Sequence, residues 1–246
     1  MSLINEIIPL PNADKDGFHD EWYPGRNFGD LIHPFKMVTA GPPGAGKTTA
    51  IMNIFLRIQL SERPFENLIV IQPNTSHEFD MLDPTVILND FPEPEDLVTG
   101  KDDEMLKTCV IIDDFDLSRL TKTQQVNVSK LFRYLSSHNN ISIMTSYQDF
   151  FSIPTIIRKC ATQFLIYKPR NQDELTVIAK RVGIKKDEMH NIFDREIKTK
   201  RDCLLIDLSC PDEFMIRKNI FQPLNIADYK TIKYAKQKYN EKDNDN

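Results

Sequence analysis

The sequence lacks long apolar runs, closely spaced cysteine pairs and an excess of basic charge. No stretch of its 246 residues approaches the roughly 18 consecutive apolar residues of a membrane-spanning helix. Its first residues have neither the basic start nor the apolar run of a signal peptide. None of its four cysteines belongs to a C-x-x-C pair, and Cys109 and Cys160 adjoin apolar runs, as reduced core cysteines do. We therefore expect a protein without a membrane span in a reducing, cytosolic compartment.

Basic residues do not outnumber acidic ones. The chain has 31 Lys and Arg against 36 Asp and Glu, which gives a formal net charge of −5 and a pI of about 5.6. This balance excludes a protein that coats nucleic acid through uniformly basic charge. Any contact with nucleic acid must come from a local basic patch or from a channel in an oligomer.

The most informative motif that is present runs from Gly41 to Thr48. It has the pattern G-x-x-x-x-G-K-T, which is that of the phosphate-binding P-loop. Glycines allow a tight turn whose backbone amides converge on phosphate oxygens, and the helix that follows adds its N-terminal partial charge. Lys47 is expected to reach the β- and γ-phosphates, and Thr48 to bind Mg²⁺. The residues expected to hold ATP are Gly41, Pro42, Pro43, Gly44, Ala45, Gly46, Lys47, Thr48 and Thr49.

Short apolar runs alternate with segments of helical spacing around this motif. Continuous apolar runs are typical of strands buried on both faces of a parallel sheet. They occur at 35–40, 68–71, 109–112, 141–144 and 164–167, and the helical segments lie at 47–60, 121–136 and 153–159. This alternation predicts a layered α/β domain, with a mostly parallel sheet of five or more strands and helices on both faces.

Composition divides the whole chain into three parts. We expect an irregular leader over 1–30, the α/β core over 31–170, and a small C-terminal α+β appendage over 171–246. Within the core, residues 74–107 are rich in proline and acidic residues, which predicts a surface insertion with one short strand at 85–88.

The expected appendage combines helices with a hairpin. Helical spacing recurs at 173–182 and 186–197, and two apolar runs at 204–208 and 214–217 flank a turn that contains Pro211. A basic helix is expected from Lys230 onward.

Two aspartates follow the strand expected at 109–112. Because ligands of open α/β sheets bind at the carboxyl ends of the strands, we expect Asp113 to hold Mg²⁺. Asp114 is expected to activate the attacking water as a general base, while Asp116 fits a cap or turn residue better. Gln148 follows the next strand and is expected to lie beside the γ-phosphate and sense hydrolysis.

The motifs that mark several classes of P-loop protein do not occur in the sequence. It contains neither the Asn-Lys-x-Asp motif of GTPases nor the Leu-Ser-Gly-Gly-Gln motif of ABC transporter ATPases, and 168–201 has no compact arginine-rich lid of a nucleotide kinase. The additional strand at 68–71, between the P-loop and the acidic strand, instead indicates the additional-strand ATPases, which include motors.

Several motifs in a fixed order narrow this class further. They are His33-Pro34-Phe35, the P-loop, Val110 to Asp114, His138 to Ile143, Ser146-Tyr147-Gln148, Ile153-Pro154 with Ile157-Arg158, Leu205-Ile206-Asp207, and Arg217 to Phe221. Over about residues 33–222 this set resembles the FtsK–HerA superfamily of DNA-translocating ATPases, in its viral genome-packaging branch (poxviruses, other large DNA viruses and virophages).

The resemblance implies a fold, partners and a place of action. The fold is a RecA-like core, assembled as a homo-oligomeric ring of five or six subunits that pumps double-stranded DNA into a capsid. The implied partners are DNA and proteins of the capsid vertex, and the implied location is the host cytoplasm at the viral factory, or the virion. A cellular translocase or helicase of the same superfamily and an ATP-switched assembly factor are the alternatives.

The resemblance also implies an arginine that reaches the P-loop of a neighbouring subunit. Arg158 matches a family position and follows the expected sensor strand, whereas Arg133 and Arg119 are the alternatives. The sequence departs from the family at three positions. Asp114 stands where relatives often have glutamate, Ser137 precedes His138 where many have arginine, and Cys160 stands where asparagine is common.

Two basic segments are candidates for contact with DNA phosphates in the pore of such a ring. The first is a cluster of Arg195, Lys198, Lys200 and Arg201. The second comprises the lysines and tyrosines from Tyr229 to Tyr239, for which a solvated basic helix is the better interpretation.

Overall fold

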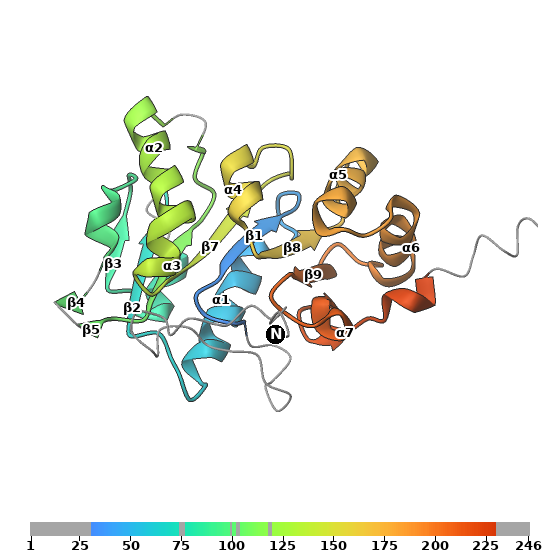
Figure 1. Cartoon of the computed structure of the whole chain (residues 1–246), viewed down its shortest axis with the longest axis horizontal. Helices are drawn as coiled ribbons and strands as arrows, with labels where there is room; N and C mark the ends of the chain where they lie inside the picture. Colours follow the sequence, from blue (N-terminus) through green and yellow to red (C-terminus); the bar gives the residue numbers. More distant parts are fainter. Residues whose placement is uncertain (1–30, 74–76, 99, 102–103, 118–119, 230–246) are drawn as a thin grey trace, which may run out of the picture.

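The fold is built on one large sheet with helices on both faces (Figure 1). The computed structural model describes residues 31–73, 77–98, 100–101, 104–117 and 120–229. The leader expected at 1–30 and the basic helix expected from Lys230 onward lie outside these residues. Within the described ranges, no helix is both long and apolar enough to cross a membrane.

Six parallel strands form the centre of the sheet and confirm the strands expected from the apolar runs. In spatial order they are β8 (Gln163–Tyr167), β1 (Lys36–Ala40), β7 (Ile141–Tyr147), β6 (Thr108–Ile112), β2 (Asn67–Ile71) and β3 (Val86–Leu88). Every residue of β2, β6, β7 and β8 is buried, as continuous apolar runs require. The additional strand β2 lies beside the acidic strand β6, and the predicted α/β fold class is confirmed.

The helices cover the two faces of the sheet unequally. Helix α1 (Lys47–Gln59) packs its Ile51, Ile54 and Phe55 on one face. The opposite face is covered by the helices α2 (Lys122–Lys130), α3 (Ser136–His138), α4 (Thr155–Cys160), α5 (Gln172–Val182) and α6 (Lys186–Glu196) (Figure 1). Between α2 and α3 the helix continues through the π-helical segment η4 (Leu131–Leu135). Two apolar cores result, one on each face.

The segment expected to interrupt the core is formed of short elements. The 3-10 helix η1 (His77–Leu82) buries Phe79 and Leu82, and β3 adds an edge strand beside β2. A second 3-10 helix and a two-stranded ribbon follow: η2 (Pro94–Leu97), β4 (Gly100–Lys101) and β5 (Glu104–Met105).

The C-terminal part extends the same sheet on its other side. Strand β9 (Cys203–Asp207) pairs antiparallel with β8, and the sheet ends in β10 (Ile216–Lys218) and β11 (Gln222–Pro223). The strand expected at 214–217 starts two residues later in the structure, at Ile216. Before it, the carbonyl of Pro211 accepts from the Phe214 amide and starts the short helix α7 (Asp212–Met215). The last described element is the 3-10 helix η5 (Ile226–Tyr229).

A buried ion pair fixes this extension. Arg217 and Asp207 are both fully buried, and their Nη2 and Oδ2 atoms lie 2.6 Å apart. Asp207 also accepts from Gln163 Nε2 at 2.9 Å, which ties the C-terminal end of β9 to the start of β8. Breaking a buried pair by removing one partner is strongly destabilising because the other charge stays buried.

We expect Arg217→Met to lower the free energy of unfolding by about 3–5 kcal/mol, because it leaves the Asp207 carboxylate buried without its cation. Urea unfolding followed by circular dichroism measures the change. The matched control is Lys218→Met on the same strand, whose ammonium lies 3.6 Å from Glu196 in a partly exposed pair, so that its removal costs under about 1 kcal/mol. Equal losses in the two variants would contradict the assigned role of the buried pair.

Candidate nucleotide-binding site

The loop between β1 and α1 has the backbone geometry of a phosphate cradle. Gly44 and Gly46 adopt positive φ values of 68° and 102°, which side chains rarely tolerate. At Gly41 an added Cβ would lie 2.5 Å from the Cβ of Tyr167, so only glycine allows the chain to pass this close to β8. Both features explain the glycine spacing of the motif, and α1 begins directly at Lys47 with its first amides unpaired by capping side chains.

Strand topology brings the expected site residues to the same edge of the sheet. Strands β1, β6, β7 and β8 are parallel, so the P-loop, Asp113, Gln148 and the residues after Tyr167 all follow carboxyl ends at this edge. The Gly41 amide donates to the Tyr147 carbonyl at 3.1 Å, which anchors the start of the loop to β7.

Lys47 folds back over the loop. Its Nζ donates to the carbonyl oxygens of Gly41 at 2.9 Å and of Pro42 at 3.4 Å. Half-burial lowers the pKa of this ammonium, while the Asp114 and Asp113 carboxylates act in the opposite direction. Lys47 is therefore held inside the loop, within electrostatic reach of both acids.

Thr48, Asp113 and Ser146 form a chain of hydrogen bonds from α1 through β6 to β7. The Thr48 hydroxyl donates to Asp113 Oδ2 at 3.0 Å, and the Ser146 hydroxyl donates to Asp113 Oδ1 at 2.5 Å. Mg²⁺ is commonly held by one or two protein oxygens together with phosphates and waters. The Thr48 hydroxyl and the Asp113 carboxylate fit this requirement, since they present adjacent oxygens beside the P-loop. In the described residues no group of three or more His, Cys, Asp or Glu side chains forms an all-protein metal site.

Asp114 has an unusual backbone. Its φ is 48°, in the left-handed region, and its amide donates to Ser146 Oγ at 2.9 Å. Aspartate tolerates this region better than most residues, but the conformation is still uncommon and is found at functional sites. The turn exposes the Asp114 side chain while Asp113 stays buried, so two consecutive carboxylates have different surroundings.

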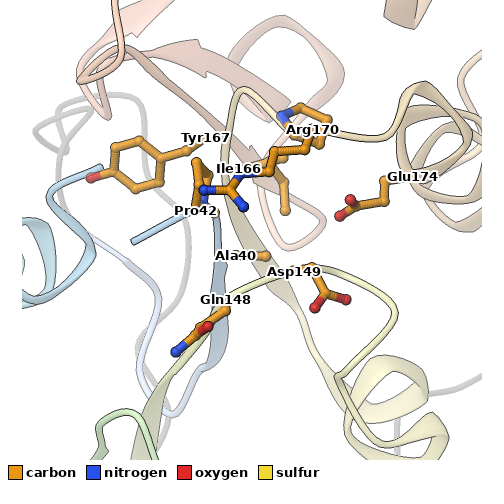
Figure 2. Close-up of a pocket in the computed structure, with 10 residues that line it drawn as sticks. Ala40, Pro42, Gln148, Asp149, Ile166, Tyr167, Arg170 and Glu174 are labelled. Atoms are coloured by element: carbon orange, nitrogen blue, oxygen red, sulfur yellow. The ribbon is translucent and has the colours of Figure 1, made fainter. Parts of the chain in front are cut away.

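A pocket opens beside the start of the P-loop (Figure 2). Its lining combines the P-loop residues Gly41 and Pro42 with Gln148 after β7 and Tyr167 and Arg170 at the end of β8. The exposed Gln148 side chain therefore lies near the loop, as its position after the strand expected at 141–144 led us to expect. Its catalytic role stays a prediction.

Glu174 holds the loop that carries Gln148. Its carboxylate is buried and accepts from the Phe150 amide at 2.7 Å, which connects α5 to the residues after β7. Burial raises the pKa of Glu174, and nearby Asp149 raises it further, although the bonds from the Phe150 and Asn171 backbones act against the shift. The link joins the pocket to the C-terminal part of the chain.

The arginines expected to act on a neighbouring subunit do not line this pocket. Arg158 on α4 lies over the Phe150 ring, with 5.7 Å from its Cζ to the ring centroid, and donates to Thr155 Oγ1 at 3.3 Å. Arg133 is exposed on the π-helical segment η4, and Arg119 lies outside the described residues. Their roles stay predictions.

Three residues at the site were not predicted from the sequence. They are Ser146, as a partner of the acids, and Tyr167 and Lys200, as neighbours of the P-loop. The Tyr167 hydroxyl donates to the Gly46 carbonyl at 2.9 Å, and Lys200 lies beside Gly44. Ser146 was within a quoted motif, and its place two residues before Gln148 was the available signal. The other two are brought to the loop by strand pairing, for which the sequence carried no signal.

Solved structures of viral packaging enzymes have a similar fold. The genome packaging NTPase B204 from Sulfolobus turreted icosahedral virus 2, in complex with AMPPCP, matches with a TM-score of 0.52 and 16% identity over 78% of this chain and 98% of that chain. Its complex with ATP-gammaS gives 0.53 and 16% over 76% and 97%. B204 from Sulfolobus Turreted Icosahedral Virus, described as a DNA-packaging ATPase, gives 0.51 and 16% over 78% and 98%.

These likenesses concern the fold. No family model and no curated protein matches the sequence. The expected resemblance to viral genome-packaging ATPases is thus confirmed in the architecture, which spans nearly the whole of the B204 chains.

The Ser146 hydroxyl generates a prediction about Mg²⁺. Loss of groups that orient a metal ligand typically weakens metal binding 10–100-fold. We expect Ser146→Ala to reduce the gain in ATPγS affinity that Mg²⁺ provides by about tenfold, because Asp113 loses its short hydrogen bond. Calorimetric titrations with and without Mg²⁺ measure this gain. Ser142→Ala is the control, since Ser142 is equally buried on β7 but bonds His33 instead. An unchanged Mg²⁺ dependence in Ser146→Ala would contradict the role of Ser146.

Proposed function

We propose that the chain is an ATPase that uses ATP hydrolysis to move double-stranded viral DNA into a preformed capsid. One observation carries the proposal. The P-loop, the Asp113–Asp114 pair and Gln148 meet at a single sheet edge, in a fold similar to that of the genome packaging NTPase B204. The amides of the P-loop suit phosphate oxygens, and the two acids suit a metal and an attacking water.

The residues divide the chemistry among themselves. Lys47 turns from the loop carbonyls to the β- and γ-phosphates of ATP, to which its three donors can bind. Thr48 and Asp113 would hold Mg²⁺, which supplies positive charge against the phosphate oxygens when bound. Ser146 keeps the Asp113 carboxylate in place throughout.

Asp114 and Gln148 supply the groups that hydrolysis needs. The exposed carboxylate of Asp114 takes a proton from the attacking water, since it is held out of the Asp113 hydrogen-bond chain. Gln148 orients that water or senses the γ-phosphate from the neighbouring strand. Through the Phe150 amide and Glu174, a shift of the Gln148 loop reaches helix α5.

DNA movement requires an assembly of several copies. We propose a homo-oligomeric ring of five or six subunits in which Arg158 reaches the nucleotide of the adjacent subunit, with Arg133, which is exposed, and Arg119 as the alternatives. Vertex proteins of the capsid are the proposed docking partners, and the host cytoplasm is the proposed place of action. The Asp114 and Gln148 arrangement favours turnover over an ATP switch that assembles without hydrolysis.

Coupling of ATP hydrolysis to DNA tests the proposed motor. We expect the purified chain to hydrolyse ATP and to do so faster when duplex DNA is added, because a motor hydrolyses ATP as it moves along its track. A phosphate-release assay with and without DNA, paired with light scattering for ring formation, measures both properties. Indifference to duplex DNA would favour the assembly switch over the motor.

Lys47→Ala is the companion variant in this assay. We expect phosphate release to fall to background, because the variant lacks the ammonium that would bind the β- and γ-phosphates. The circular dichroism spectrum should stay unchanged, because the ammonium bonds carbonyls of its own loop. Lys122→Ala is the control, since Lys122 is an exposed lysine at the start of α2. Normal hydrolysis by Lys47→Ala would mean that the site has been assigned wrongly.

Asp114→Asn tests the general base. We expect the variant to bind ATP with near-normal affinity but to hydrolyse it about 100-fold more slowly or worse, since an amide cannot accept the proton. Binding is measured by calorimetry and turnover by phosphate release. Asp116→Asn is the comparison, because Asp116 is the other exposed aspartate on the same turn. Loss of ATP binding in Asp114→Asn, or loss of hydrolysis only in Asp116→Asn, would overturn the assignment.

A further inference from the structure

A lysine far away in the sequence lies at the tip of the P-loop. A Cβ added to Gly44 would be 3.0 Å from Lys200 Nζ and 3.8 Å from Lys200 Cε. Gly44 itself has no side chain, and its φ of 68° disfavours one. No side chain of the loop itself therefore shields its tip on this side, and the ammonium of Lys200 lies over it.

Strand pairing explains how Lys200 reaches this position. Strand β9 runs antiparallel to β8, and Cys203 at its start is paired with Tyr167 at the end of β8. The turn before β9 consequently lies at the edge where the parallel strands end. Tyr167 marks the same place from β8, since its hydroxyl donates to the Gly46 carbonyl.

The turn that carries Lys200 is held by Asp202. Its Oδ2 accepts from the amides of Lys198 at 2.9 Å and Thr199 at 2.7 Å, and its Oδ1 accepts from Asn219 Nδ2 at 3.3 Å. Partial burial acts to raise the pKa of Asp202, but the hydrogen bonds from Thr199, Asn219 and Lys198 outweigh it and hold the pKa below its usual value. The bonds to the Lys198 and Thr199 amides close the turn that carries Lys200.

The basic cluster to which Lys200 belongs in the sequence is divided in the structure. Lys198 Nζ donates to the Asp194 carbonyl, and Arg195 Nη1 donates to the Asp228 carbonyl while its guanidinium covers the Tyr229 ring. Among the described residues, none forms an ion pair or hydrogen bond with the Lys200 ammonium. An ammonium that no described residue binds thus faces a loop built to bind an anion.

We propose that Lys200 binds the polyphosphate of the nucleotide in the same subunit, as a second lysine beside Lys47. The inference rests on the proposed ATP site and adds a residue to it. Lys47 approaches from within the loop, whereas Lys200 approaches from outside, over Gly44. The two positive charges offset the repulsion that Asp113 and Asp114 exert on the phosphates.

The contact connects the nucleotide to the C-terminal part of the chain. Lys200 is linked through the turn that Asp202 closes to β9, which continues the sheet to the buried Asp207–Arg217 pair. Binding or release of a phosphate chain at Lys200 therefore acts on β9 as well as on α1.

Nucleotide binding to Lys200→Met in the full chain tests the inference. The methionine keeps most of the apolar stem of the lysine and removes the charge, and the exposed position predicts an unchanged fold. We expect ATPγS and ADP to bind about tenfold more weakly, the size of losing one hydrogen bond to a charged group. AMP should lose less than about twofold, since it lacks the β- and γ-phosphates. Calorimetric titration with each of the three nucleotides gives the dissociation constants.

Two variants and the wild type make the outcome decisive. Lys198→Met removes a lysine from the same turn whose ammonium bonds a carbonyl, and we expect it to change ATPγS affinity by less than about twofold. Lys200→Arg should restore most of the affinity, because it restores the charge. Unchanged ATPγS binding in Lys200→Met, or an equal loss for AMP, would overturn the inference. Failure of the wild type to bind ATPγS would overturn the proposed function with it, whereas normal wild-type binding isolates Lys200.

Discussion

The pairing of parallel strands that are buried on both faces is the constraint on which this structure depends. Because both faces are covered by helices, polar groups can meet a ligand only at the ends of the strands, and parallel strands place all their carboxyl ends together. The P-loop follows β1, Asp113 follows β6 and Ser146 is the last residue but one of β7, so three segments far apart in sequence become hydrogen-bonded neighbours. The site is a consequence of the sheet order, and the sheet order is fixed by which apolar strands pack side by side.

Much of this arrangement could be predicted because its signals are local. The glycine spacing of the P-loop, the apolar runs and the acids that end one of them are each contained within a few residues, and the structure agrees with the strands and helices that they predict. Roles that depend on long-range pairing could not be predicted. Nothing near Lys200 in the sequence indicates that β9 pairs antiparallel with β8. Without that pairing, the sequence shows only that the lysine belongs to a basic cluster, and not which part of the fold the cluster faces. The hairpin strand failed for the opposite reason, since a local proline turn overrode its apolar pattern at Phe214.

Strand β9 connects the C-terminal part of the chain to the sheet edge that carries the P-loop. Its first residue, Cys203, lies beside Tyr167 at the nucleotide edge, and its last residue, Asp207, lies at the opposite edge in a buried pair with Arg217. Between these ends its backbone is paired on two sides, with β8 and with β10. The segment that composition separates from the core is thus a direct continuation of the sheet that holds the P-loop.

The charges around the loop show why a second lysine is useful there. Two carboxylates, Asp113 and Asp114, lie close enough to Lys47 to influence its pKa, and the same carboxylates repel a polyphosphate. Burial also disfavours the charged form of Lys47. If Lys47 were the one lysine of an ATP site, it would have to stay charged despite its burial and also offset the repulsion from both carboxylates. An ammonium on an exposed turn avoids the burial penalty and still reaches the loop tip, because Gly44 presents no side chain. In the proposed site, positive charge on the outside of the loop therefore offsets the repulsion between the two carboxylates and the phosphates.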